Sequence, residues 1–248
     1  MTALLLSDLH LPAEPSPLRE GFLRFLDGPA RTARQVYILG DLFEYWIGDD
    51  AGLALYRDEI RALRALTDAG VRIGFMHGNR DFLVGTGFAR ASGVELLADP
   101  IRVDLDGEAT LLSHGDAWCS DDRAYQRWRR FSRNPLAQSL FLRLPTSLRA
   151  RIAGDVRRRS DDDKDRKTVE IMDVHPSAIA EAFRACGCRR IIHGHTHRPA
   201  THRLQIGGRE VERIVLADWT PQRMEWLEAG DGLRRVGFDG NLTIRGTC

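Results

Sequence analysis

The chain predicts an α/β fold in which two packed β-sheets carry helices on their outer faces. In the first half, short apolar strands alternate with amphipathic helices, and the second half is rich in closely spaced short strands. One helical segment interrupts those later strands. The chain has 248 residues, enough for a well-buried domain with an insertion. We therefore expect residues 1–248 to form a single domain.

The first half contains three strand patterns separated by two helix patterns. Pro17 marks the start of the first helix, and Gly70 marks the end of the second. Strands that are joined through helices in this way usually run parallel in one sheet. The predicted strands cover residues 3–7, 36–39 and 72–76, and the second helix covers residues 53–69.

The second half contains short strands joined by turn signals. Asp106-Gly107 and Gly207-Gly208 each separate two strand patterns, as expected for hairpins. The predicted strands cover residues 94–96, 101–105, 110–113, 202–206, 210–217, 223–227 and 233–238. This β-rich half should supply the second of the two packed sheets.

Residues from about 119 to 170 fit neither half and predict a helical insertion, which we call the cap. Apolar side chains recur every three to four residues within 134–154, and Pro145 should break that helix. Between Arg123 and Arg159 there are eleven arginines and one acid, Asp155, a net charge of +10. The formal net charge of the whole chain is only +1. Such asymmetry indicates an anionic partner: phosphate, nucleic acid or a lipid surface.

The remaining composition is ordinary for a soluble globular protein, with 43% hydrophobic and 29% charged residues. No apolar run approaches the roughly 20 residues that span a bilayer, and the N-terminus reads as a core strand rather than a secretion signal. The four cysteines match no zinc motif and predict no disulfide framework, which favours a reducing cytoplasm. Among them, Cys119 is interpreted as a small packed residue.

Five short motifs, each directly after an apolar strand pattern, contain seven potential metal ligands. Strand ends that recur in this way can converge on one edge of a sheet, where α/β folds bind their ligands. The motifs are Asp8-Leu9-His10, Gly40-Asp41, Gly78-Asn79-Arg80-Asp81, Ser113-His114-Gly115-Asp116 and His193-Gly194-His195-Thr196-His197. Asp81, Asp116 and Asp218 are candidates for orienting the ligand imidazoles.

The ligand types predict two divalent metal ions. Aspartate, histidine and asparagine without a thiolate suit Mn²⁺, Fe²⁺ or similar ions. Seven ligands exceed what one ion with an open position needs, so two ions should share a carboxylate, for which Asp41 is the natural candidate. Such a pair of ions would activate a water and offset phosphoryl charge. The first ion would be bound by Asp8, His10 and His197, and the second by Asn79, His114 and His195.

These motifs resemble those of the calcineurin-like metallophosphoesterases, over about residues 1–118 and 189–220. The resemblance implies a four-layer α/β/β/α sandwich with a dinuclear site at the strand ends. That family usually has a proton-donating histidine where this chain has Arg80. Arginine is a poor acid but grips phosphate well, so Arg80 should clamp the transition state. A phosphate-type leaving group needs less protonation, which favours cleavage of a pyrophosphate.

A closer resemblance runs nearly end to end, to the UDP-2,3-diacylglucosamine pyrophosphohydrolases of Gram-negative lipid A synthesis. It is carried by Asp8–Leu11, Gly40–Asp50, Gly78–Phe82, Ile171–Val174 and His193–Pro199. It implies a Mn²⁺-dependent enzyme with two ions per chain, or other divalent ions, in which water attacks the α-phosphate. The products would be UMP and 2,3-diacylglucosamine 1-phosphate (lipid X). The resemblance assigns catalysis to Asp41, Asn79, Arg80 and His195, and substrate binding to Asn79, Arg80, Asp122, Tyr125, Ser160, Lys164, Lys167 and His195.

The cap fits a diacylated substrate, because it combines apolar helical faces with positive charge. We expect it to hold the acyl chains and to rest on the anionic cytoplasmic face of the inner membrane, with no nucleic-acid partner. We expect a cytoplasmic, peripheral monomer. Two alternatives stay open: a general phosphodiesterase or protein phosphatase on the same fold, and a binding scaffold that has lost its metals.

Overall fold

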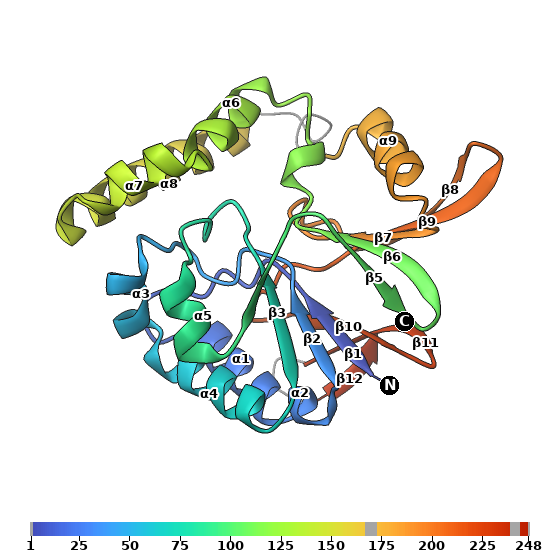
Figure 1. Cartoon of the computed structure of the whole chain (residues 1–248), viewed down its shortest axis with the longest axis horizontal. Helices are drawn as coiled ribbons and strands as arrows, with labels where there is room; N and C mark the ends of the chain where they lie inside the picture. The colour runs from blue at the N-terminus through green and yellow to red at the C-terminus, as the bar shows by residue number, and fades with distance from the viewer. Residues whose placement is uncertain (1, 167–172, 239–243, 248) are drawn as a thin grey trace.

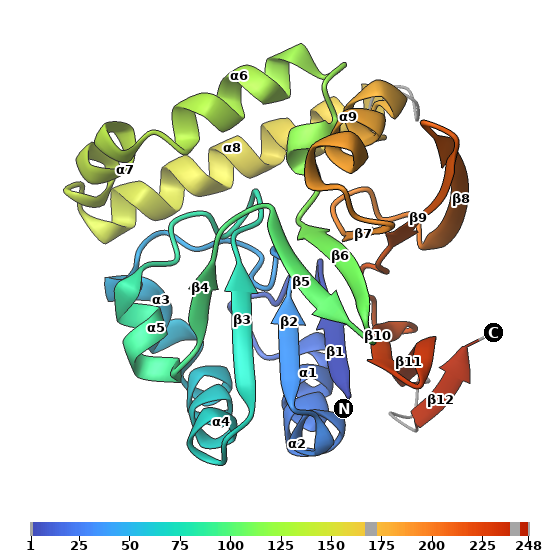
Figure 2. The same cartoon turned by 45° about the vertical axis from the view of Figure 1, so that its right-hand side comes forward.

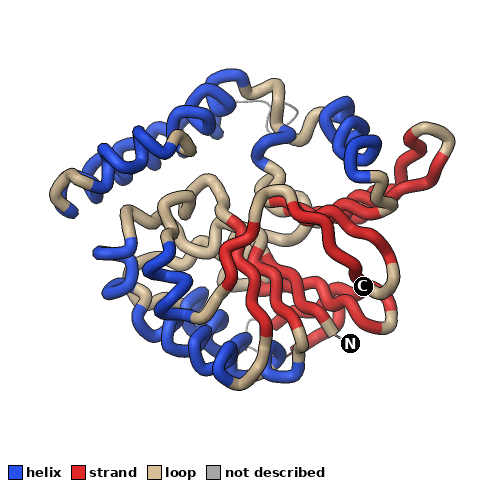
Figure 3. The backbone as a smooth tube through the Cα atoms, in the orientation of Figure 1, coloured by secondary structure: helices blue, strands red, loops and turns tan. Residues whose placement is uncertain are grey.

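The computed structural model describes residues 2–166, 173–238 and 244–247, which form four layers and a separate group of helices (Figure 1). One layer is a seven-stranded sheet in the order β12-β11-β10-β1-β2-β3-β4. A second layer is a five-stranded sheet in the order β5-β6-β7-β9-β8. Helices cover the outer face of each sheet, as Figure 3 shows in blue against red strands. The predicted α/β/β/α sandwich is therefore confirmed.

The seven-stranded sheet is built around the parallel strands predicted from the first half. Its parallel part consists of β1 (Ala3–Leu6), β2 (Gln35–Ile38), β3 (Arg72–Met76) and β4 (Glu95–Leu97). The C-terminal strands return to this sheet rather than to the other one, with β10 antiparallel to β1. These strands are β10 (Met224–Gly230), β11 (Gly232–Phe238) and β12 (Ile244–Thr247).

The five-stranded sheet mixes hairpins with parallel pairs. Its strands are β5 (Ile101–Leu105), β6 (Glu108–Ser113), β7 (Arg190–His193), β8 (Ala200–Ile206) and β9 (Arg209–Val215). The two predicted hairpins are present, since β5 pairs with β6 and β8 with β9 in antiparallel fashion. Central strand β7 is parallel to both β6 and β9. The carboxyl ends of β6 and β7 therefore lie side by side.

Buried apolar side chains fill each gap between layers. Between the sheets, Leu5 and Met76 belong to one cluster with Ile192 and Ile214. The outer helices of the larger sheet are α1 (Pro17–Asp27), α2 (Pro29–Thr32), α3 (Asp49–Leu55), α4 (Arg57–Asp68) and α5 (Thr86–Ser92). On the smaller sheet, α9 (Pro176–Cys186) buries Ile179 and Phe183. At about 25 cal/mol per Å² of apolar surface, these clusters are the main favourable term in folding.

The predicted helix over residues 53–69 is wrong in its bounds, because the chain forms two helices that meet at Tyr56. The Tyr56 ring is fully buried and lies 4.3 Å from the ring of Phe43. Its hydroxyl donates a hydrogen bond to the Leu11 carbonyl at 3.0 Å. These contacts hold Tyr56 outside helical geometry, at φ −112° and ψ 34°.

The cap contains α6 (Arg123–Ser132), α7 (Pro135–Leu142) and α8 (Thr146–Arg166), which we call the cap helices. Pro145 lies between α7 and α8, so the predicted break is confirmed. Figures 1 and 2 show the cap helices together beyond the carboxyl ends of the parallel strands, away from α4. Among the described residues, no helix has the length and apolar character needed to cross a membrane.

Candidate metal centre

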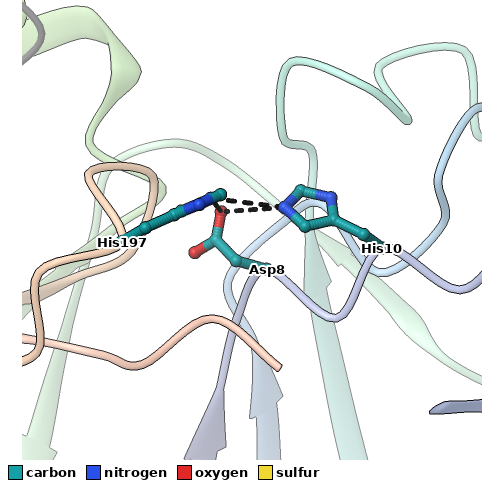
Figure 4. A group of neighbouring side chains, drawn as sticks. All are labelled: Asp8, His10 and His197. Atoms are coloured by element: carbon teal, nitrogen blue, oxygen red, sulfur yellow. Dashed lines mark hydrogen bonds and ion pairs between the residues drawn. The ribbon is translucent and has the colours of Figure 1, made fainter. Parts of the chain in front are cut away.

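The candidate ligands converge at the carboxyl ends of β1, β2, β3, β6 and β7. Asp8, His10 and His197 form one group in which the potential ligand atoms lie within 4.8 Å of one another. Figure 4 shows these three side chains pointing toward a common centre. Asp41 and His114 form a second group with Asp8, within the same limit. The shared Asp8 makes the two groups contiguous.

The backbone at this site is held in a conformation that L-residues rarely adopt. Five of the seven candidate ligands have positive φ values: Asp8 (56°), His10 (49°), Asp41 (52°), His195 (66°) and His197 (55°). Among the other described non-glycine residues, only Asp106 has a positive φ. Left-handed backbone of this kind costs on the order of 1 kcal/mol per residue and is retained where function requires it. The strain is therefore concentrated on the candidate ligands.

Asp41 occupies the middle of the site. Its carboxylate accepts a hydrogen bond from the Arg80 backbone N–H at 2.8 Å and lies 3.9 Å from His114 Nε2 and 4.0 Å from His10 Nδ1. Burial raises the pKa of Asp41, and the neighbouring Asp8 charge adds to that rise. Asp81 supports the same loop, because its carboxylate accepts hydrogen bonds from backbone N–H groups of Leu42 and Gly78.

Asn79 lies between two of the candidate histidines. Its Oδ1 is 3.1 Å from His114 Nε2 and 2.9 Å from His195 Nδ1. The other nitrogen of His114, Nδ1, donates to the Leu39 carbonyl at 2.8 Å, which turns Nε2 toward the site. Burial alone would lower the pKa of His114, but the carboxylates of Asp41 and Asp8 raise it to about 9. For His195, burial and then the nearby His114 charge lower the pKa to about 3.

The loop after β7 is packed tightly against the end of β1. The His195 backbone N–H donates to Asp8 Oδ2 at 2.8 Å, and Ser7 Oγ donates to the same oxygen at 2.6 Å. Only glycine fits at Gly194, because an added Cβ would lie 2.3 Å from Asp8 Oδ2. The loop thereby places His195 beside Asn79 and His197 beside Asp8, 3.3 Å from Oδ1.

Arg80 lies at the edge of this site. Its Nε is 3.8 Å from Asp41 Oδ2, and its Nη1 donates to Glu44. Glu44 also pairs with Arg157 of α8, so it connects Arg80 to the cap. Sequence reasoning missed this role of Glu44, although the residue stands only three positions after Asp41 in a motif that was recognised.

The predicted substrate contacts of the cap fall into two sets. Tyr125 lies beside the centre, with its ring centroid 5.7 Å from that of His195. Asp122 caps α6 by accepting a hydrogen bond from the Tyr125 backbone N–H at 3.0 Å. Ser160 and Lys164 belong to α8, whose side chains are not described at those positions, and Lys167 lies outside the described residues.

The three carboxylates expected to orient imidazoles have different surroundings. Asp218 Oδ2 lies 3.9 Å from His197 Nδ1, which suits that role. Asp81 instead binds backbone amides, as described above. Asp116 binds side chains of α6, including the Tyr125 hydroxyl at 2.6 Å. The sequence could not predict the contacts of Asp116, because they depend on how α6 packs against the body of the protein.

The donor set fits divalent cations. Two buried carboxylates, an amide oxygen and imidazole nitrogens gather with their potential ligand atoms a few ångströms apart, a set that suits Mn²⁺ and related ions. The site carries Asp8 and Asp41 with almost no solvent exposure. Buried carboxylates of this kind are expected to pair with cations or coordinate metals. The arrangement can therefore hold divalent ions next to the Arg80 guanidinium, as phosphoryl chemistry requires.

Comparison with known proteins identifies close relatives and distant structural neighbours. No family model matches the chain. UDP-2,3-diacylglucosamine hydrolase from Pseudomonas aeruginosa is 49% identical over 238 residues, covering 96% of this chain and 99% of that protein. The Pseudomonas syringae protein of the same name is 47% identical and covers 95% of both chains. The Klebsiella pneumoniae protein is 49% identical over 219 residues, 88% of this chain and 91% of its own.

Two solved structures share the fold at low sequence identity. A dimetal phosphatase from Danio rerio aligns with a TM-score of 0.53 at 14% identity, covering 99% of this chain and 98% of its own. Vacuolar protein sorting 29 from Cryptosporidium parvum aligns with a TM-score of 0.50 at 12% identity, covering 99% and 96%. These likenesses confirm the sandwich fold and no more than the fold.

Proposed function

Because the chain belongs to the family of UDP-2,3-diacylglucosamine hydrolases, we propose that it cleaves the pyrophosphate bond of UDP-2,3-diacylglucosamine. A water attacks the α-phosphorus, and the bond from that phosphorus to the bridging oxygen breaks. The products are UMP and 2,3-diacylglucosamine 1-phosphate. The observation that carries this proposal is the convergence of the candidate ligands beside Arg80 at the end of the parallel strands.

Two divalent ions, Mn²⁺ by preference, belong to this proposal. Asp8, His10, Asp41 and His197 would hold one ion, and Asp41, Asn79, His114 and His195 the other. When bound, such ions activate the water and offset the charge of the phosphoryl oxygens. Asp8 groups with His10 and His197, and also with Asp41 and His114. The Asp41 carboxylate lies 4.0 Å from His10 Nδ1 and 3.9 Å from His114 Nε2, which supports a shared Asp41.

The chain's own residues bind and orient the pyrophosphate. Arg80 presents a guanidinium that can bind two phosphoryl oxygens at once. His195 Nδ1 lies 2.9 Å from Asn79 Oδ1, and the His195 ring lies 5.7 Å from the ring of Tyr125. Asp122, Ser160, Lys164 and Lys167 are assigned to substrate binding as part of the same proposal.

The cap helices are assigned to the lipid part of the substrate and to the membrane surface. Among the described residues, nearly all exposed large apolar side chains lie on α6 and α7: Trp128, Phe131, Leu136, Leu140 and Leu142. Exposed arginines lie among them. An apolar surface mixed with positive charge fits an anionic bilayer. We propose a monomer that binds the cytoplasmic face of the inner membrane.

An Asp41→Ala variant tests the proposal. The purified wild-type protein should release UMP from UDP-2,3-diacylglucosamine when Mn²⁺ is present and lose this activity in a chelator. Asp41→Ala should reduce kcat by at least about a thousandfold. The variant lacks a charged ligand of the metal ions, so those ions would no longer stabilise the charge of the phosphoryl oxygens as well. Metal analysis should give two ions per wild-type chain and fewer in the variant.

Full turnover by Asp41→Ala would contradict the assignment. Faster wild-type hydrolysis of a simple phosphodiester or phosphoprotein than of the lipid nucleotide would favour a general phosphoesterase instead. Less than one ion per wild-type chain would favour a binding scaffold without metals.

A further inference from the structure

Asp116 anchors the first cap helix to the body of the protein. Its carboxylate is fully buried. One oxygen, Oδ2, accepts hydrogen bonds from two side chains of α6, the Tyr125 hydroxyl at 2.6 Å and Arg129 Nε at 2.9 Å. It also accepts one at 3.2 Å from Nη2 of Arg133, the residue that caps the end of α6. The Asp116 backbone carbonyl also accepts a hydrogen bond from Gln126 Nε2 at 2.8 Å. Three side chains of α6 and that of its C-cap residue thus converge on a single residue of the body.

The same contacts reach the segments that carry the candidate ligands. Asp116 stands two residues after His114. Arg133 Nη2 also donates to the Gly78 carbonyl at 3.2 Å, directly before Asn79. The Tyr125 ring lies 5.7 Å from the His195 ring. Cap helix α6 is therefore tied to the segments of His114, Asn79 and His195, all assigned to the second ion.

The contacts are strong enough to fix the helix. Hydrogen bonds to charged groups are stronger than those between neutral groups, and removing one partner of a buried ion pair destabilises a protein more than removing one partner of an exposed pair. Arg129 and Arg133 are mostly buried, with side-chain exposures of 21% and 23%. Both guanidinium groups donate to the Asp116 carboxylate.

We propose that Asp116 is a positioning residue that fixes α6, and with it Tyr125, over the metal centre. Its carboxylate sets the distance between the cap and the reacting phosphate. This role concerns selectivity for a substrate that spans both cap and centre, so it rests on the proposed function. Small phosphodiesters, which need only the centre, depend on the anchor much less.

The test compares two substrates in the presence of Mn²⁺: UDP-2,3-diacylglucosamine and bis(p-nitrophenyl) phosphate. An Asp116→Asn variant keeps the shape of the side chain but loses its charge. Its kcat/KM for the lipid nucleotide should fall at least about tenfold more than that for the diester, mainly through KM, because about 1.4 kcal/mol of anchoring corresponds to a factor of ten. Arg133→Gln should shift the ratio in the same direction.

Glu59→Gln is the matched control. Glu59 is a fully buried carboxylate that accepts two hydrogen bonds from Arg19, at 2.7 Å and 2.8 Å, between α1 and α4. Glu59→Gln should lower the free energy of unfolding without changing the ratio of kcat/KM for the lipid nucleotide to that for the diester. Equal losses on both substrates in Asp116→Asn would overturn the proposal, because they would mean that Asp116 serves the metal centre itself.

Amide hydrogen exchange gives a second measurement that needs no substrate. Asp116→Asn should raise the exchange rate of α6 amides at least about tenfold relative to those of α4. Glu59→Gln should instead raise the exchange rate of α4 amides relative to those of α6. Unchanged α6 exchange in Asp116→Asn would also overturn the proposal. If the wild-type protein failed to cleave the lipid nucleotide, the proposed function would fail, whereas the exchange result would still decide whether Asp116 anchors α6.

Discussion

Gly194 lies where the loop after β7 packs against the end of β1, and there is no room for a side chain between them. A Cβ there would lie 2.1 Å from Ser7 Oγ and 2.3 Å from Asp8 Oδ2. Gly194→Ala should push the loop of His195 and His197 away from Asp8. Since a displacement of about 1 Å can reduce activity a hundredfold, we expect a loss of about that size together with weaker metal binding, measured by titration.

Gly230→Ala is a suitable control for that change. The nearest heavy atom to an added Cβ at Gly230 is Thr2 Oγ1 at 3.5 Å, an ordinary contact. Its activity and metal content should match those of the wild type. Normal metal binding by Gly194→Ala would show that the loop can move aside without losing its ligands.

Cys119 should be unreactive in the folded protein. Burial raises the pKa of its thiol to about 12, and the negative charge of Asp116 adds to the rise. A raised pKa disfavours the thiolate, so at pH 8 only about one thiol in ten thousand is in the reactive form. Iodoacetamide at pH 8 should therefore modify the half-buried Cys186 well before Cys119, as measured by peptide mass spectrometry. Unfolding in guanidinium should remove the difference.

The seven candidate ligands could be predicted because each motif directly follows an apolar strand, and strand ends meet at one edge. The hydrogen bonds between Asp116 and the side chains of α6 could not be predicted from the sequence. In the sequence, Arg129 and Arg133 look the same as Arg127 and Arg130, which are exposed. Only the rotation of α6 against the body decides which arginines turn inward, and that rotation is set by tertiary contacts.

Arg149 attaches the long cap helix α8 to the body. It is 2% exposed, donates to the backbone carbonyls of Leu144 and Ile47, and pairs with Asp50 at the start of α3. Arg149→Met should lower the free energy of unfolding by about 2 kcal/mol, because two carbonyls lose their donors while Asp50 remains solvated. The exposed Arg151 of the same helix gives the control, and Arg151→Met should change stability by less than about 0.5 kcal/mol. Equal stabilities in urea denaturation would contradict this role.

Most strands could be predicted from their apolar runs and turn signals, whereas several other elements could not. Helix α5 is only seven residues long and carries little periodicity, and α9 begins directly after residues that gave no start signal other than Pro176. The break at Tyr56 depends on the burial of its ring against Phe43, which is a tertiary contact. Local pattern decides an element's type better than its ends, because neighbours in space decide the ends.

The arginines that make the charge of the chain uneven include some that pair with carboxylates and others that are exposed. Arg129, Arg133, Arg149 and Arg157 pair with carboxylates of the body or of the site. Arg127 and Arg143 are exposed on or next to the cap helices, together with the large apolar side chains of α6 and α7. The sequence predicted the excess charge but not this division, so the membrane hypothesis depends on fewer arginines than the count of eleven suggests.

Membrane binding should accordingly follow the exposed arginines of the cap. Each basic residue near an anionic surface contributes about 1 kcal/mol. Reversing Arg127, Arg130 and Arg143 to Glu should therefore weaken binding to phosphatidylglycerol vesicles at least about a hundredfold at low salt, measured by co-sedimentation. The wild-type protein itself should dissociate as salt rises, because screening shortens the range of the attraction.

The matched control reverses three exposed arginines of α4: Arg57, Arg61 and Arg64. Helix α4 lies at the opposite end of the molecule from the cap helices (Figures 1 and 2). Both triple variants change the net charge equally, so a general effect of net charge would weaken vesicle binding in both. A loss confined to the cap variant would mean that the cap helices face the bilayer. Because Asp116 holds α6, one of these helices, beside the candidate metal centre, that orientation would place the pyrophosphate of a membrane-embedded substrate at Arg80 while its acyl chains remain near the lipid.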